Sequence, residues 1–111
     1  MSGADEQLWT AVADPTRRRL LDLLLAGGPT TATGLAEELP VTRQAIAKHL
    51  AVLERAGLLA SRREGRELHW SVVPEGLDLA TRSMARAAAT WDERLTTLRQ
   101  LAETDDDDRG S

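Results

Sequence analysis

The amino-acid sequence, 111 residues long, predicts a mainly α-helical fold of the α+β class, with about five helices and one two-stranded antiparallel β-hairpin. Three observations lead to this prediction. Apolar side chains recur every three or four residues along most of the chain, which is the period of an α-helix. After Gly57 the period changes to two, as in a β-strand, and the helical period returns from about residue 76. Proline and glycine separate these segments.

The composition restricts the classes of protein to which the chain can belong. Cysteine is absent, which excludes disulfide scaffolds and thiolate metal sites and is compatible with the cytoplasm. No apolar run approaches the length of a membrane span, and the first residues lack the charged and apolar parts of a signal peptide. We therefore expect a cytoplasmic protein with no membrane contact, no bound metal and no cofactor.

Charge is distributed unevenly along the chain. The formal net charge is −4, but residues 103–111 hold five acidic residues and one arginine, so the remainder is close to neutral. Between residues 42 and 71, six basic residues stand against three acidic ones, and such local positive potential attracts phosphate. We expect residues 1–102 to form one domain. Residues 103–111 should be a disordered acidic tail, which either keeps the protein soluble or competes for the basic surface.

The first predicted helix covers residues 5–13. Leu8 and Val12 lie one turn apart in it, with Trp9 beside them. A tryptophan so near the start of the chain packs either on its own core or on a partner subunit.

A second helix is predicted to follow at once, over residues 15–26. Asp14 can cap it, because its carboxylate can accept from the free backbone N–H groups of the first turn, and Pro15 fits its first position, where the N–H that proline lacks would have no partner. Its leucine-rich sequence predicts the central core helix. The cluster Arg17, Arg18 and Arg19 forms either a solvated or salt-bridged face or a phosphate contact.

Two short helices are predicted next, over residues 33–39 and 42–55, with a tight turn between them. Gly27, Gly28 and Pro29 end the preceding helix, and residues 30–33 supply capping hydroxyls. Helices joined by so brief a turn, the second one basic and amphipathic, form a helix-turn-helix.

The helix over residues 42–55 has two contrasting faces. Ile46, Leu50 and Leu53 form an apolar stripe, and Thr42 is a natural N-cap. The opposite face carries short, basic and amide side chains, which suit insertion into the major groove of DNA or, alternatively, an ordinary surface helix. The candidate DNA-binding residues of this helix are Thr42, Arg43, Gln44, Ala47, Lys48 and His49.

Residues 58–73 predict a β-hairpin with a turn at Gly65. Leu68, Trp70 and Val72 alternate toward one face. A hairpin that follows a helix-turn-helix is a wing, and arginines near its tip commonly lie along phosphates or enter the minor groove. The candidate residues are Arg62, Arg63 and Arg66, with a merely solvated hairpin as the alternative.

The last predicted helix covers residues 76–102. Its apolar positions follow one another at intervals of four and three residues, as in a coiled coil: Met84, Ala88, Trp91, Leu95, Leu98 and Ala102. So small a domain leaves much of this stripe uncovered, so we expect a second copy of the chain to cover it, rather than one helix of a monomeric bundle. Trp9, Met84 and Trp91 either pack in the core or line a pocket for a small apolar effector at the dimer interface.

Taken together, the stretches V-A-D-P-T-R-R-R-L-L-D-L-L (12–24), T-R-Q-A-I-A-K-H-L-A-V-L-E-R-A-G-L-L (42–59) and R-R-E-G-R (62–66) resemble the ArsR/SmtB-type winged helix-turn-helix regulators. The resemblance covers roughly residues 5–102. The ending W-D-E-R-L-T-T-L (91–98) is similar to a branch that is often encoded beside START-like lipid-binding proteins.

This resemblance implies a homodimeric repressor that binds an inverted repeat, usually overlapping its own promoter. It also implies a recognition helix at residues 42–55, a wing at residues 58–73 and dimerisation through the first and last helices. The dimer residues expected on that basis are Leu8, Trp9, Val12, Met84, Ala88, Trp91, Leu95 and Leu98.

Metal sensing, common among such regulators, is disfavoured by the residues themselves. The third-helix stretch has no cysteine and the last helix has no histidine. His49 and His69 are the two histidines, and a zinc site requires three or four convergent ligands. His49 is expected to fix the helix or to touch a phosphate.

The leading functional prediction is thus a sequence-specific repressor that binds double-stranded DNA as a dimer. The alternative is a winged-helix module for protein–protein assembly, without specific DNA binding. An enzyme is disfavoured, because the chain has no phosphate-cradling glycine motif and no recognisable nucleophile–histidine–carboxylate order.

Overall fold

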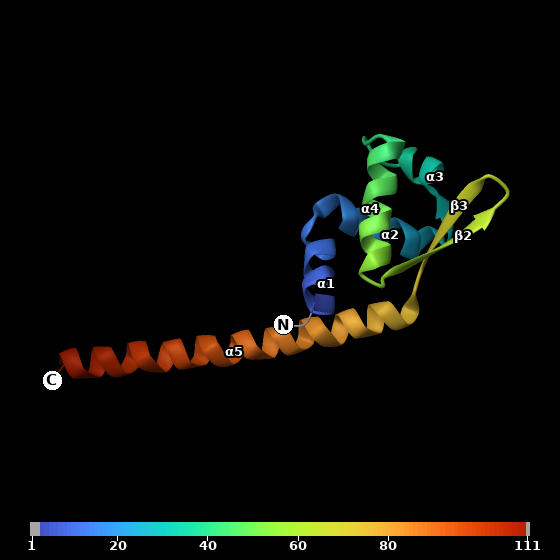
Figure 1. The fold of residues 1–111 in the computed structure, drawn as a ribbon. Coiled ribbons are helices and arrows are strands. Elements are labelled where there is room, and N and C mark those ends of the chain that lie inside the picture. The colour runs from blue at the N-terminus through green and yellow to red at the C-terminus, as the bar shows by residue number, and fades with distance from the viewer. Residues whose placement is uncertain (1–2, 111) are drawn as a thin grey trace. The chain divides into compact units, whose positions relative to one another are not determined.

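The computed structural model describes residues 3–110, without the side chains of residue 4 and of residues 105–110 (Figure 1). The described part contains five helices and a small antiparallel sheet, which confirms the predicted winged helix-turn-helix class. In chain order the elements are α1 Gly3–Ala13, α2 Pro15–Gly27, β1 Thr30–Thr31, α3 Ala32–Ala36, α4 Arg43–Arg55, β2 Leu59–Glu64, β3 Glu67–Val72 and α5 Pro74–Gly110.

The predicted caps set the boundaries of the helices. Asp14 Oδ1 accepts hydrogen bonds from the backbone N–H groups of Thr16 (2.8 Å) and Arg17 (3.1 Å), which starts α2. Gly28, at φ 79°, ends that helix in a conformation that favours glycine. Thr42 Oγ1 accepts from the backbone N–H of Ala45 at 3.1 Å and starts α4 as expected. In contrast, α3 is shorter than the predicted segment 33–39.

The sheet has the strand order β1-β3-β2. The hairpin β2–β3 is the predicted wing, and Gly65 turns it at φ 62°. The two-residue strand β1 was not predicted: Thr30 pairs with Trp70 and Thr31 with His69. So short a strand has no sequence period, and it forms because the chain passes beside the edge of β3.

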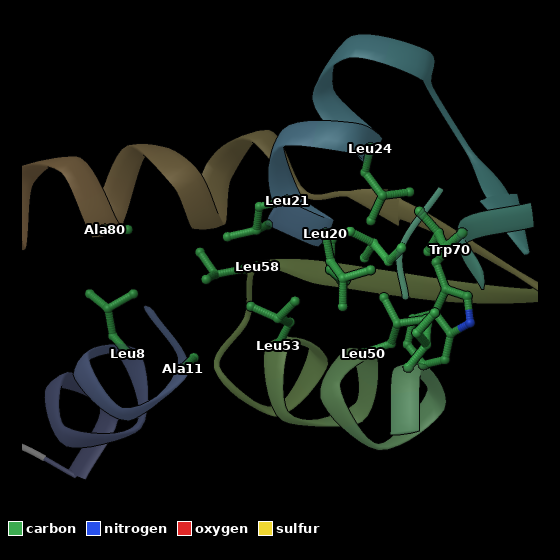
Figure 2. Close-up of a cluster of buried hydrophobic side chains, with 14 residues drawn as sticks. Leu8, Ala11, Leu20, Leu21, Leu24, Leu50, Leu53, Leu58, Trp70 and Ala80 are labelled. Atoms are coloured by element: carbon green, nitrogen blue, oxygen red, sulfur yellow. The ribbon is translucent and has the colours of Figure 1, made fainter. Parts of the chain in front are cut away.

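The core lies between α1, α2, α4 and the base of the wing (Figure 2). Six leucine and isoleucine side chains are almost completely enclosed: Leu20, Leu35, Ile46, Leu50, Leu53 and Leu58. Trp70 of β3 packs beside the leucines of α2 and α4 and compensates for the absence of phenylalanine and tyrosine. Burial of the α4 stripe holds the opposite face of that helix in solvent.

The start of α5 packs closely on the turn between α4 and β2. A Cβ atom placed on Gly76 would lie 1.9 Å from the carbonyl oxygen of Gly57. The helix begins at Pro74, two residues before the predicted start, because proline fits a first helical position.

By its internal contacts the chain divides into two compact units, Met1–Ala80 and Thr81–Ser111. Helix α5 continues through the acidic stretch to Gly110, whereas the sequence led us to expect a tail without regular structure. No proline or glycine interrupts this helix between Gly76 and Gly110, so nothing in the backbone ends it earlier. The extent of the domain, residues 1–102, stays a prediction.

No helix in the described part of the chain combines the length and apolar character needed to cross a bilayer.

Candidate nucleic-acid interface

Helix α4 presents an exposed polar face. Because Ile46, Leu50 and Leu53 are buried, the helix cannot rotate without exposing them. The predicted contact residues Thr42, Arg43, Gln44, Ala47 and Lys48 are all exposed, and His49 is half-buried.

A cleft of about 200 Å³ separates α4 from the wing. Arg43 and Ala47 line it from the helix, and Arg63 and Arg66 line it from the hairpin. Glu67 is its one acidic residue. The structure therefore brings basic residues from two separate predicted segments to the two sides of one cleft.

Three residues at the start of α3 also line this cleft and were not predicted as site residues. They are Thr31, Ala32 and Thr33. The sequence indicated only that hydroxyls in this stretch cap a helix, and Thr31 does so, since its Oγ1 accepts from the backbone N–H of Gly34 at 3.1 Å. Their position beside Arg43 follows from the packing of α3 on α4, which no local pattern encodes.

The arginines of the wing lie on different faces of the hairpin. Arg63 pairs with Leu68 across the two strands, on the face that lines the cleft. Arg62 pairs with His69 and lies on the opposite face, because successive side chains of a strand alternate. Of the three predicted wing arginines, Arg63 and Arg66 therefore line the cleft and Arg62 lies outside it, and DNA contact by all three stays a prediction.

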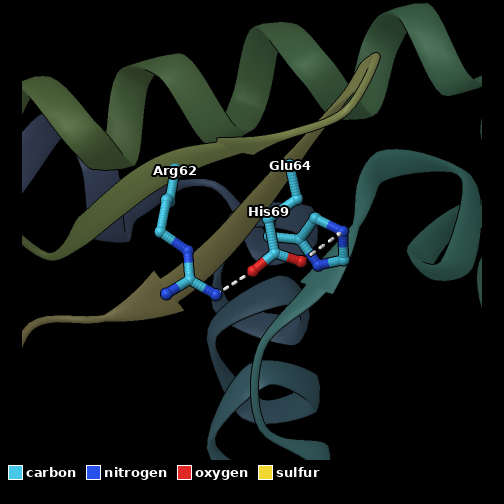
Figure 3. A network of polar contacts seen from close by, with 3 residues as sticks. All are labelled: Arg62, Glu64 and His69. Carbon is cyan, nitrogen blue, oxygen red and sulfur yellow. Dashed lines mark hydrogen bonds and ion pairs between the residues drawn. The ribbon is translucent and has the colours of Figure 1, made fainter.

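On that outer face, Arg62 is held by a carboxylate (Figure 3). Its Nη2 donates to Oε1 of Glu64, and Nε2 of His69 lies 3.5 Å from Oε2 of the same residue. Glu64 thus lies between Arg62 and the histidine. All three side chains are at least partly exposed, so this ion pair contributes little stability but neutralises part of the charge of Arg62.

Arg17 and Arg18 have a role that the sequence did not predict. Arg17 donates from Nε to the carbonyl oxygen of Ala11 and from Nη2 to that of Thr10, both at 2.8 Å. Its Nη1 lies 3.1 Å from Nδ1 of His49. Arg18 Nη1 donates to the carbonyl oxygens of the next two residues of α1.

The same corner of the molecule changes the acidity of Asp14. The hydrogen bond from the backbone N–H of Arg17 lowers the pKa of this carboxyl, and partial burial opposes that effect. The backbone N–H of Thr16 and the positive charge of Arg17 lower it further. The capping carboxylate is therefore ionised over a wider pH range than an ordinary aspartate.

The residues expected at a dimer interface are placed differently in the two terminal helices. In α1, Leu8 is only 6 % exposed and Val12 packs on the core, so these two side chains support their own chain; Trp9 is half-buried. The assignment of Leu8, Trp9 and Val12 to a dimer interface stays a prediction. In α5, Trp91, Leu95, Leu98 and Leu101 are 52–62 % exposed. Ala88 is exposed too, and Met84 is half-buried.

Two further observations concern chemistry at the surface. Among the side chains that the structure describes, no three His, Cys, Asp or Glu residues are grouped in a way that could hold a metal ion. On α5, the guanidinium carbon of Arg94 lies 5.1 Å from the centre of the Trp91 ring, within the range of a cation–π contact.

Comparison with known proteins agrees with this geometry. A family model described as a helix-turn-helix domain matches residues 12–62. The transcriptional regulator Rv2034 of Mycobacterium tuberculosis is 36 % identical over 103 residues, which cover 93 % of this chain and 92 % of that protein. The transcriptional repressor SdpR of Bacillus subtilis is 37 % identical over 65 residues, which cover 59 % of this chain and 71 % of the repressor.

Among solved structures, an ArsR-like transcriptional regulator from Rhodococcus sp. RHA1 superposes with a TM-score of 0.67 at 38 % sequence identity. The match covers 89 % of this chain and 92 % of that one.

Proposed function

Because the chain belongs to the ArsR-like family of helix-turn-helix transcriptional regulators, which bind DNA and are not enzymes, we propose that it is a dimeric repressor of an inverted-repeat operator. In this proposal the operator overlaps its own promoter. The exposed face of α4 enters the major groove, and the wing β2–β3 follows the DNA backbone or the minor groove.

The cleft between α4 and the wing is the observation that carries this proposal. Arg43 lies on one side of it and Arg63 and Arg66 on the other, against one carboxylate, Glu67. A helix seated in the major groove has the sugar–phosphate backbone along its flank. The cleft therefore offers guanidinium groups on both sides of a passing phosphate, and such charge-assisted contacts supply most of the affinity.

We assign base reading to the exposed α4 face. Arg43 and Lys48 can bind guanine O6 and N7, Gln44 can bind adenine, and Ala47 lets the helix backbone approach. Thr42, His49, Arg63 and Arg66 contact phosphates. Arg62 contacts the backbone from the outer face of the wing, in competition with Glu64.

The exposed stripe of α5 supports the homodimer. Leu95 and Leu98 lie four and seven residues after Trp91, on one face of the helix, and all three are more than half exposed. We propose that a second copy of α5 covers this stripe, with Met84 and Ala88 extending it, and that Trp9 of α1 also contacts the partner subunit. Two-fold symmetry of such a dimer matches an inverted repeat.

Sedimentation or light scattering tests the dimer directly. Leu95→Glu places a charge in the stripe and should dissociate the dimer, whereas Gln100→Glu, an exposed change away from the stripe, should leave it intact. Equal molar masses for both variants would refute the interface.

We also propose that the regulator does not sense metal, as in the START-associated branch. Both histidines already face other groups: Nδ1 of His49 lies beside the guanidinium of Arg17, and Nε2 of His69 lies beside Glu64. A cation at His49 would be repelled by Arg17.

We propose instead that the regulator responds to a small apolar effector bound at the α5 interface. Tryptophan fluorescence during titration with hydrophobic compounds would detect such binding.

Fluorescence anisotropy tests DNA binding. The protein is titrated on its own upstream DNA and on a scrambled duplex over a salt series. Tight binding that prefers the upstream DNA and weakens steeply with salt is the expected result. No binding to either duplex at low salt would refute the proposal and favour a protein–protein interaction module.

Two variants separate base reading from phosphate contact. Gln44→Ala should reduce the preference for the upstream DNA by roughly 1–3 kcal/mol. Arg66→Ala should weaken both duplexes similarly and reduce the salt slope by about one. Equal losses on both duplexes for Gln44→Ala would exclude Gln44 as a base reader.

A further inference from the structure

Arg17 joins two helices with different proposed tasks. Its guanidinium donates to the carbonyl oxygens of Thr10 and Ala11 at the end of α1, and a third N–H group reaches Nδ1 of His49 on α4 at 3.1 Å. The end of α1 is thus connected through one side chain to the helix proposed to read DNA.

The position of Arg17 is determined by the break between α1 and α2. The last carbonyls of α1 have no partners within their own helix, so they need donors from elsewhere. Arg17 and Arg18 supply them, since Arg18 Nη1 donates to the carbonyl oxygens of Val12 (2.6 Å) and Ala13 (3.2 Å). Asp14 also holds the backbone N–H of Arg17, so the arginine is anchored at both its main chain and its side chain.

This anchoring decides which nitrogen of His49 carries the proton. Arginine has only donors, so Nδ1 of His49 must accept. A neutral histidine that accepts at Nδ1 carries its proton on Nε2, on the other side of the ring. His49 therefore directs an N–H group away from Arg17, one residue after the exposed Lys48.

Building on the proposed DNA binding, we infer that Arg17 is a positioning residue for the operator contact: it holds His49 in the Nε2–H tautomer, so that His49 donates to a DNA phosphate. Arg17 itself does not touch DNA. Its effect on affinity passes through the histidine, and it also links the orientation of α1 to that of α4.

The chain offers a matched control for this inference. Arg17→Met and Arg18→Met each remove hydrogen bonds from the end of α1, but only Arg17 contacts His49. A loss that comes only from an uncapped α1 should therefore appear in both variants, and a loss that passes through His49 should appear in Arg17→Met alone.

The first measurement uses the free full-length protein with ¹⁵N-labelled histidine. Long-range ¹H–¹⁵N correlation spectra at about pH 8, where histidines in general are neutral, report the tautomer of each ring. We expect the Nε2–H form of His49 in the wild type and in Arg18→Met, and a mixture of tautomers in Arg17→Met. An unchanged tautomer in Arg17→Met would overturn the inference without any reference to DNA.

The second measurement is affinity for the upstream DNA. Glutamine at position 49 places its amide nitrogen near the position of the histidine Nε2 and can still donate to a phosphate. Asparagine is shorter and places its amide oxygen near the position of Nδ1, so it has no donor at the Nε2 position. His49→Gln should keep its affinity within about threefold, whereas His49→Asn should lose about tenfold, the effect of one hydrogen bond to a charged acceptor. Arg17→Met should lose about two- to fivefold, less than His49→Asn, because part of its histidine still carries the proton on Nε2. When His49→Gln is already present, adding Arg17→Met should cause little further loss of affinity for the upstream DNA.

The outcomes separate this inference from the proposed function. Equal losses of affinity in Arg17→Met and Arg18→Met would overturn the positioning role while leaving DNA binding intact. If the wild type bound no DNA, the proposed function would fail together with the phosphate contact, and the tautomer measurement would still decide whether Arg17 orients His49.

Discussion

Gly76 is the residue whose replacement should test the packing of this fold most directly. It lies in the first turn of α5, against the turn that follows α4, and an added Cβ would come to 1.9 Å from the carbonyl oxygen of Gly57. The next nearest atoms are also backbone, the carbonyl carbon of Gly57 at 2.9 Å and Cα of Leu58 at 3.4 Å. No flexible side chain can move aside, so either the helix or the turn must shift.

Two opposing effects determine the size of the change for Gly76→Ala. Alanine is favoured over glycine within a helix by about 1 kcal/mol. Against this, the contact would have to open by more than about 1 Å to reach ordinary van der Waals distance, and overpacking of this kind typically costs about 1–3 kcal/mol, occasionally more. A clash with backbone atoms should cost an amount near the upper end of that range, and the helix preference of alanine offsets about 1 kcal/mol of it. We therefore expect a net loss of about 2 kcal/mol in the free energy of unfolding and a fall in Tm of roughly 10 °C.

Gly27→Ala is the control for this prediction. Gly27 is also helical, at the end of α2, and an added Cβ meets nothing within 4 Å. This variant should be as stable as the wild type or up to about 1 kcal/mol more stable. Thermal unfolding followed by circular dichroism, at one protein concentration because association shifts Tm, measures both. A Gly76→Ala variant as stable as Gly27→Ala would refute the close packing of α5 on this turn.

Three further predictions concern the caps and the wing. Thr42→Ala should lower stability by about 1 kcal/mol, because the N-cap of α4 is lost, whereas Thr42→Ser should lose little; equal Tm values for the two variants would contradict this. Asp14→Asn should be less stable than the wild type near neutral pH, where the carboxylate of the wild type is ionised. The difference in Tm between the two proteins should narrow as the pH falls below the ordinary aspartate pKa of 3.8, because the stability that a lowered pKa provides is lost when the carboxylate is protonated. A gap in Tm that does not change with pH would refute that cause. Glu64→Gln should strengthen binding to specific and scrambled DNA by roughly three- to tenfold at low salt, because it releases Arg62 for phosphate; unchanged anisotropy titrations would contradict the competition.

The local elements of the fold could be predicted from the sequence because their signals lie within a few residues of each other. Asp14 and Thr42 cap the helices at which they were expected to act, and the alternation around Trp70 marks the strand of the wing. The apolar stripe of α4 likewise determined which of its faces is buried and which is exposed. Capping, turn conformation and side-chain period are all short-range effects, so they can be read without knowing how the helices pack.

The arrangement of the site depends on tertiary structure. The sequence predicted Arg62, Arg63 and Arg66 as candidate DNA-binding residues without assigning them to a face. Pairing between β2 and β3 places Arg63 in the cleft with Arg43, and Arg62 beside Glu64 on the other face. Strand β1, too short to have a period, exists only because it reaches the edge of β3.

The sequence by itself determined the winged helix-turn-helix class and the candidate DNA-binding helix, because these follow from periods and caps. Only the tertiary structure decided that Arg17 reaches His49, 32 residues further along the chain, and that Gly76 must be small. Contacts of that kind depend on how packed helices approach one another, and the packing is set by the whole buried core rather than by neighbouring residues.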